Sequence, residues 1–181
     1  PYHAVDAAAA RIAHHSAESL SEYLRTRRHA KGDEPLDQET LRGQSPGPAE
    51  LAVGKEASTF ARPFGLFFGE ESAAGHVGYR AGAAGVCLGR DRWFRDDLLL
   101  GLSVAYAHTD LRLSDARGAG QLDNVRVGPY LMLLEGDWFF DGSVTYGWHD
   151  NELARNVEVG PLLGTPASRY DAHDMAHGVA A

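Results

Sequence analysis

The sequence predicts a mainly β fold, an antiparallel up-and-down transmembrane β-barrel of which about six strands are present, preceded by an N-terminal α-helix. Three observations support this prediction. Bulky apolar residues recur at every second position from about residue 57 onward, which is the period of a β-strand. The alternate positions carry mostly small or polar residues and few charges. Long and short connections alternate between the strands, as they do in membrane barrels.

The first 56 residues are predicted to form a pore or linker helix and a flexible linker, ahead of a barrel domain over residues 57–181. From about Val5 to Arg28, apolar residues repeat at helical spacing. Asp6 lies near the start and arginines lie near the end, as the helix dipole favours. The apolar face is narrow and rich in alanine, which suits a narrow, partly polar space. Residues 29–56 contain prolines and glycines without periodicity, which is typical of a linker.

Strands are predicted near residues 59–68, 79–91, 97–111, 122–134 and 138–150, with a sixth beginning near residue 168. Their bulky apolar side is predicted to face lipid, and its residues are Leu98, Leu100, Leu102, Val104, Val125, Val127 and Val144. The polar side is predicted to line a lumen, and its residues are Asn124, Arg126, Tyr130, Asp141, Ser143 and Thr145. Within that lumen, Arg126 and Asp141 could pair across neighbouring strands or meet the arginines of the helix.

Arg62 does not fit this division, because Phe60, Phe64 and Leu66 share its parity. An arginine on the lipid side would cost about 2–4 kcal/mol at the membrane midplane and much less near an interface. The position of Arg62 close to the start of a strand favours the interface.

An antiparallel sandwich would alternate in the same way. A soluble sheet, however, usually shows charged residues on its outer side, whereas here the polar side is built of Gly, Ser, Ala and Thr, and Lys is absent after Lys55. We therefore favour the barrel. The alternatives are a soluble β-rich binding module, which would bury Leu98, Leu102 and Val104, and a porin-like channel, which the preceding helix disfavours.

Connection lengths and aromatic residues indicate two membrane interfaces. The connections at 69–78, 112–121 and 151–167 are long, and those at 92–96 and 135–137 are short. Aromatic residues gather mainly beside the short ones and resemble the girdle of a membrane barrel. The predicted girdle consists of Trp93, Phe94, Trp138, Phe140 and Trp148.

Composition and motifs argue against several other functions. The net charge of −8 and the lack of a long basic block argue against a nucleic-acid partner. A run of about 18 apolar residues, as a transmembrane helix requires, does not occur. The segment "HDMAH" would hold zinc through His173 and His177 only if it were helical, and its surroundings predict a strand. We therefore expect no metal, no cofactor and no enzymatic activity.

Several segments between about residues 57 and 181 resemble the β-domain of bacterial autotransporters, the translocator of type V secretion. They are "FARPFG", "GYRAGAAGVCLGRDRWFRDDLLLGLSVAYAHTDLRL", "LDNVRVGPYLML" and "WFFDGSVTYGWHDNELAR". The N-terminal helix is similar in placement to the helix that family members carry in the pore.

This resemblance implies a barrel of about 12 strands in the outer membrane of a Gram-negative bacterium, which exports and anchors its own passenger segment. It also implies outer-membrane lipid and the barrel-assembly machinery as partners. The chain departs from the family pattern because it has about six strands, ends in "GVAA" without a terminal aromatic residue, and lacks the Asn pair at which some members cleave their linker. We therefore interpret it as the N-terminal half of such a barrel and expect no self-cleavage.

Overall fold

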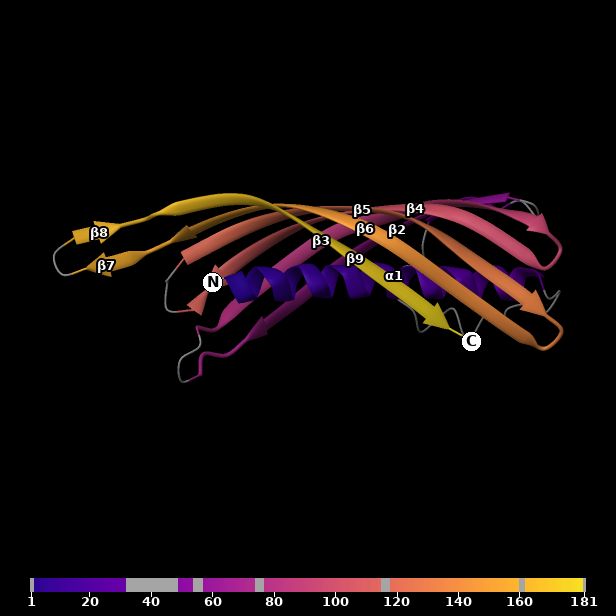
Figure 1. Cartoon of the computed structure of the whole chain (residues 1–181), viewed down its shortest axis with the longest axis horizontal. Helices are drawn as coiled ribbons and strands as arrows, with labels where there is room; N and C mark the ends of the chain where they lie inside the picture. Colours follow the sequence, from indigo (N-terminus) through magenta and orange to yellow (C-terminus); the bar gives the residue numbers. More distant parts are fainter. Residues whose placement is uncertain are drawn as a thin grey trace.

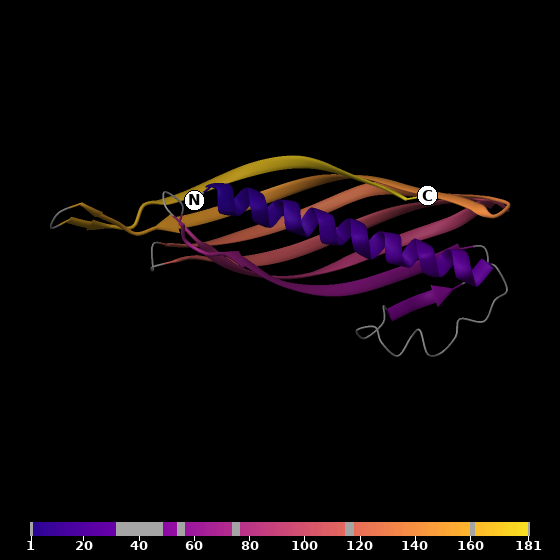
Figure 2. The same cartoon turned by 90° about the horizontal axis from the view of Figure 1, so that it is seen from below.

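A single helix lies along one face of a curved sheet in the computed structural model, which describes residues 2–31, 49–53, 57–73, 77–114, 118–159 and 162–180. The helix, α1, spans Tyr2–Lys31. Figures 1 and 2 show it lying along the concave side of the arched strands. We call the concave, helix-facing side the inner face and the convex side the outer face. Among the described residues, no helix combines the length and the apolar character needed to cross a membrane.

The sheet is an antiparallel meander, which confirms the predicted fold class. Its strands are β1 (Ala49–Val53), β2 (Ala57–Glu70), β3 (Tyr79–Arg95), β4 (Leu98–Leu113), β5 (Gly118–Glu135), β6 (Trp138–Arg155) and β9 (Ala167–Ala180). They lie side by side in that order, and each runs antiparallel to its neighbours. The short strands β7 (Val157–Val159) and β8 (Leu162–Gly164) form a separate hairpin that projects from one end of the sheet (Figure 1).

Two ends of the sheet differ in their connections. At one end, β3 and β4 are joined through residues 96–97, and β5 and β6 through residues 136–137. Gly136 has a φ of 59°, a left-handed conformation that glycine adopts without a steric cost. We call this the short-turn end and the opposite one the long-loop end. α1 begins at the long-loop end and finishes at the short-turn end, where the ammonium of Lys31 lies 3.8 Å from the ring centroid of Trp93.

The strands are longer than predicted, chiefly toward the long-loop end. The connection expected over residues 112–121 is shorter, because β4 continues to Leu113 and β5 begins at Gly118. Polar residues that suggested a loop, such as Arg112 and Gln121, remain in the ladder. β1 lies within the predicted linker, of which residues 32–48 and 54–56 lie outside the described residues.

Three apolar clusters pack α1 onto the inner face. At the long-loop end, Ala4, Val5 and Ala8 meet a group formed by Tyr79, Ala81, Leu111, Leu113, Leu122 and Leu153. In the middle, Ile12 packs on Ala83 and Ala107. At the short-turn end, Leu20, Tyr23 and Leu24 meet a group formed by Phe60, Cys87, Leu99, Ala105, Tyr130 and Met132. The core of the described structure therefore lies between the helix and the inner face.

Candidate functional site

The outer face exposes large apolar side chains. Leu102 is 54 % exposed and Val104 is 41 % exposed, so the burial that a soluble sandwich requires of them is absent. Leu100, Val125 and Val144 are also exposed, while Leu98 and Val127 are half-buried on the same face. A continuous apolar surface of this kind is unusual on a soluble monomer and marks contact with a membrane or another protein.

Aromatic side chains border this apolar surface. Phe94, Trp138, Phe140 and Trp148 are exposed, and Trp138 is 80 % exposed. Trp93, which we also expected in the girdle, does not lie with these exposed aromatic residues. Its strand position places it on the inner face, where it packs beside the short-turn cluster and under the ammonium of Lys31. The Lys31 ammonium stabilises the Trp93 ring in this position, because the face of an indole attracts positive charge.

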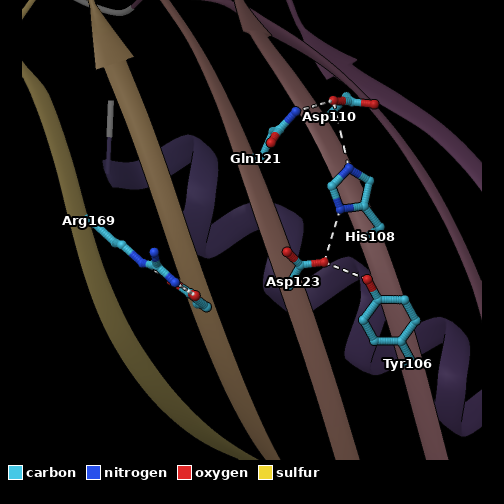
Figure 3. A network of polar contacts seen from close by, with 7 residues as sticks. Tyr106, His108, Asp110, Gln121, Asp123 and Arg169 are labelled. Atoms are coloured by element: carbon cyan, nitrogen blue, oxygen red, sulfur yellow. Dashed lines mark hydrogen bonds and ion pairs between the residues drawn. The ribbon is translucent and has the colours of Figure 1, made fainter.

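A polar belt follows the apolar surface toward the long-loop end. Tyr106, Val125 and Trp148 lie in one cross-strand row, and His108, Asp123 and Asp150 lie in the next row on the same face. Figure 3 shows the contacts of this belt. The hydroxyl of Tyr106 donates to Asp123 at 2.6 Å, and Nδ1 of His108 lies 3.0 Å from the same carboxylate.

Two further contacts belong to the same belt. Gln121 donates to Asp110 at 3.4 Å, and Nε of Arg169 donates to Asp150 at 3.0 Å (Figure 3). The outer face thus changes from apolar to hydrogen-bonded polar groups within one row, as expected where a wall leaves hydrocarbon for water.

The predicted lumen residues all lie on the inner face, beneath or beside the helix. Asn124, Arg126, Tyr130 and Asp141 are buried, and Ser143 and Thr145 are half-buried. A small enclosed space between α1 and the wall is lined in part by Arg126, Ser143 and Thr145. The inner face therefore carries buried polar side chains beside its apolar clusters.

Arg126 forms an ion pair with Asp174 of β9 rather than with Asp141, contrary to one arrangement that the sequence allowed. It also donates to the hydroxyl of Thr145 at 3.3 Å. Nε2 of His149 lies 3.3 Å from the same Asp174, and its Nδ1 lies 2.7 Å from the amide nitrogen of Asn124. These contacts join β5, β6 and β9 through polar side chains of one face.

Buried polar contacts between helix and wall meet at Asp91, a residue that the sequence analysis did not single out. Its carboxylate accepts hydrogen bonds from Tyr23 at 2.5 Å, Arg27 at 3.0 Å and Tyr130 at 3.0 Å. The side chains of Arg27 and Asp91 are 3 % and 0 % exposed. The available signal was the alternation of β3, which sets Asp91 on the inner face as a lone acid.

Glycines make room for the aromatic rings around Asp91. A Cβ at Gly101 would lie 2.1 Å from the ring of Tyr130, and one at Gly89 would lie 2.2 Å from the ring of Phe60. Phe60 in turn stacks on Tyr23, with 3.9 Å between ring centroids. The strand glycines therefore allow wall aromatics to lie flat under the helix.

Arg62 also belongs to the helix–wall interface, which corrects the expected position near lipid. It donates to Glu22 at 2.5 Å and to the backbone oxygen of Ser19 at 2.7 Å. Phe60 and Phe64 share its face because this part of the wall lies directly under α1. The helix covers this part of the wall, so the bulky residues there are shielded from solvent.

His173 and His177 lie on a strand and are exposed on the outer face, so their spacing does not place them on one helical face. The ring of His173 stacks on Tyr146, with 5.8 Å between centroids. Within the part of the chain that the structure describes, His, Cys, Asp and Glu form no group of three or more arranged to hold a metal.

These features define a class of protein. An antiparallel meander with an apolar outer face, a bordering polar belt and a polar inner face is the wall of a membrane β-barrel. Here a helix fills the inner side of that wall.

A family model described as Autotransporter beta-domain matches residues 59–181. The chain therefore belongs to the autotransporter β-domain family, and its role is that of an outer-membrane translocator domain. The family implies a passenger segment and the setting of the Gram-negative outer membrane, and it is a translocator family rather than one known for catalysis. No curated protein and no solved structure matches the chain. The family match begins in β2, so α1 lies outside it.

Proposed function

We propose that residues 57–181 form a sector of a barrel wall in the outer membrane, and that residues 1–56 supply the helix that occupies its pore and the linker that follows. The observation that carries this proposal is the reversed burial of the two faces. Large apolar residues such as Leu102 and Val144 are exposed outside, whereas polar residues such as Asn124 and Arg126 are buried inside.

The outer face is proposed to contact membrane lipid. Its apolar stretch runs over residues 98–106 in β4, 125–133 in β5 and 140–148 in β6, about nine residues in each strand. That length matches a tilted strand crossing the hydrocarbon core. The exposed aromatics Phe94, Trp138 and Phe140 would then lie at one interface, and Trp148 toward the other.

The two edges of the described sheet support a role for further strands and for assembly factors. β1 and β9 each have one neighbour only in this sheet. Hydrocarbon cannot satisfy the free backbone groups of an open edge, so spanning walls are closed. We expect both edges to be paired in the membrane, and the barrel-assembly machinery of the outer membrane to be the partner that allows closure.

The direction of α1 supports the export of a passenger segment. Tight turns of bacterial outer-membrane barrels lie on the periplasmic side and long loops lie outside. α1 runs from the long-loop end to the short-turn end, so its first residues point toward the cell surface (Figure 2). A polypeptide joined ahead of Tyr2 would therefore emerge outside the cell, anchored by the wall.

Conductance across a planar bilayer tests the pore assignment. We expect the intact protein that contains this chain to conduct weakly, and the same protein lacking residues 1–31 to conduct several times more, because the helix no longer fills the lumen. Both forms are first checked for the gel-mobility shift on boiling that a folded barrel shows. Equal conductance in two folded forms would contradict the helix as pore occupant and favour a porin-like channel.

A further inference from the structure

Two arginines interrupt the apolar outer face near the short-turn end. Arg90 and Arg92 are exposed and lie on the outer face of β3. The acid between them, Asp91, points to the opposite face and binds Tyr23 and Arg27 there. Within the described part of the chain, neither Arg90 nor Arg92 has a hydrogen-bond or ion-pair partner.

Their neighbours on the same face supply no negative charge. Arg90 lies opposite Thr59 of β2 and Leu102 of β4, while Arg92 lies opposite Ala57 and Leu100. Both leucines are exposed, so the arginines stand beside the surface that faces lipid. Two other outer arginines have acidic partners, since Arg95 bonds Asp97 and Arg169 bonds Asp150. Arg80 and Arg112 lack such partners among the described residues, but they lie beyond the polar belt rather than beside the apolar surface.

An arginine on the lipid side of a barrel is destabilising at the midplane and tolerated near an interface. The long side chain can extend toward the headgroups while its stem stays among apolar groups. The guanidinium fork matches a phosphate and binds it through paired hydrogen bonds. Arg90 and Arg92 are two residues apart on one strand, about 7 Å along its axis, so both can reach a single phosphate.

The surface on the membrane side of these arginines is apolar. Going toward the long-loop end, the outer face of β2 presents Ala61, Pro63 and Gly65. Across from them on β3 lie Leu88, Val86 and Ala84 in register. Small side chains lie beside larger ones there, so we expect an extended acyl chain to lie along this pair of strands.

We propose that Arg90 and Arg92 bind the phosphate of one anionic phospholipid of the periplasmic leaflet, whose acyl chains lie over the β2–β3 surface. This inference rests on the proposed contact of the outer face with lipid. Asp91 lies between the two arginines in sequence but faces the helix, so it does not neutralise them. The phosphate of the bound lipid would supply that negative charge.

The test compares two charge-matched double variants of the intact protein. R90Q/R92Q removes the proposed site. R80Q/R112Q removes two exposed outer arginines that lie opposite each other beyond the polar belt, and is the control. Each protein is held in nanodiscs of equal phosphatidylglycerol and phosphatidylethanolamine, transferred to detergent, and analysed for retained lipid by native mass spectrometry.

We expect wild type and R80Q/R112Q to retain phosphatidylglycerol over phosphatidylethanolamine, and R90Q/R92Q to retain about tenfold less of it. Excess inorganic phosphate should leave the lipid in place, because the acyl chains also bind. Equal retention by R90Q/R92Q, no preference in the wild type, or displacement by inorganic phosphate would each overturn the proposal.

Failure of this site is distinguishable from failure of the proposed function. All three proteins are first tested for the mobility shift on boiling and for insertion into the nanodiscs. A protein that inserts and shifts but lacks the lipid preference contradicts the phosphate site alone. A wild-type protein that neither inserts nor shifts contradicts the membrane wall itself.

Discussion

The outer and inner faces of the sheet carry opposite arrangements of apolar and polar side chains. Outside, Leu102 and Val104 are exposed, although both would be buried in a soluble domain. Inside, Asp91 and Arg126 are buried, although charged residues rarely are unless paired. The difference fits a wall whose inner face is matched to a partly polar helix and whose outer face is matched to the lipid that we propose it contacts.

The two faces also differ in where their charged side chains lie and in which partners those side chains have. On the inner face, Asp91 accepts hydrogen bonds from three side chains. Arg126 pairs with the carboxylate of Asp174 and donates to the hydroxyl of Thr145. On the outer face, charges gather in the polar belt beyond Tyr106 or at the short-turn end. The following changes test this difference, beginning with the largest expected effect.

Asp91→Ala removes the acceptor shared by Tyr23, Arg27 and Tyr130. Breaking a buried ion pair leaves the partner charge uncompensated, so we expect a loss of about 3–5 kcal/mol in the free energy of unfolding. Guanidinium unfolding of the intact protein in lipid vesicles measures it. Asp123→Ala removes an acid from the exposed belt and should have a much smaller effect. Similar losses of unfolding free energy in both variants would show that the buried contacts of Asp91 stabilise the protein no more than those of the exposed belt.

Val104→Arg places a charge in the middle of the outer apolar surface. We expect a cost of about 2–4 kcal/mol, because a guanidinium near the midplane loses its hydration. Ala119→Arg, on the outer face of β5 beyond the polar belt, is the matched control and should be nearly neutral. The same unfolding measurement in vesicles compares them. If both variants were equally stable, the outer face would not lie in hydrocarbon.

Gly101→Val adds atoms where the ring of Tyr130 lies against the inner wall. A Cβ there would lie 2.1 Å from that ring, and Tyr130 is held by Asp91 and by the helix. We expect a loss of about 1–3 kcal/mol from overpacking. Gly136→Asn is the control at an open turn with a φ of 59°, which asparagine tolerates. Thermal gel-shift midpoints rank the two, and a stable Gly101→Val would contradict close packing under α1.

Arg62→Ala removes a contact at the margin of the helix–wall interface. Glu22 is 56 % exposed, so solvent screens the ion pair, and we expect a loss of about 1 kcal/mol or less. Glu22→Gln tests the charge alone and should cost less than Arg62→Ala, since Arg62 also donates to Ser19. Urea unfolding curves separate them. A loss as large as that of Asp91→Ala would place Arg62 among the main anchors of α1.

Period-two alternation was enough to predict the meander and the division of β4, β5 and β6 into two faces. Residues such as Val104 and Asn124 lie on opposite faces because alternation is a property of the strand itself. The helix Tyr2–Lys31 was predicted a few residues short at each end. These elements depend on local pattern, which the sequence contains.

The errors arose where a distant segment decides the environment. Arg62 and Trp93 lie under α1, and local parity does not reveal that a helix will cover these positions. Arg112 and Gln121 suggested a loop because polar residues were read as the end of a strand, whereas the strands continue beyond the apolar surface. β1 was assigned to the linker because it is too short to show a periodic pattern. It forms a strand by pairing with β2.

Site-directed spin labelling tests the central claim most directly. In a Cys87→Ser background, single cysteines replace Leu102, Val104 and Val144 on the outer face, and Ser103, Ala105 and Thr145 on the inner face. Each labelled protein is placed in vesicles, and collision with oxygen is compared with collision with a water-soluble nickel complex. We predict that the outer labels meet oxygen far more often than nickel, and that the inner labels do not. Outer labels that meet neither reagent, as in a closed protein interior, would contradict the membrane wall.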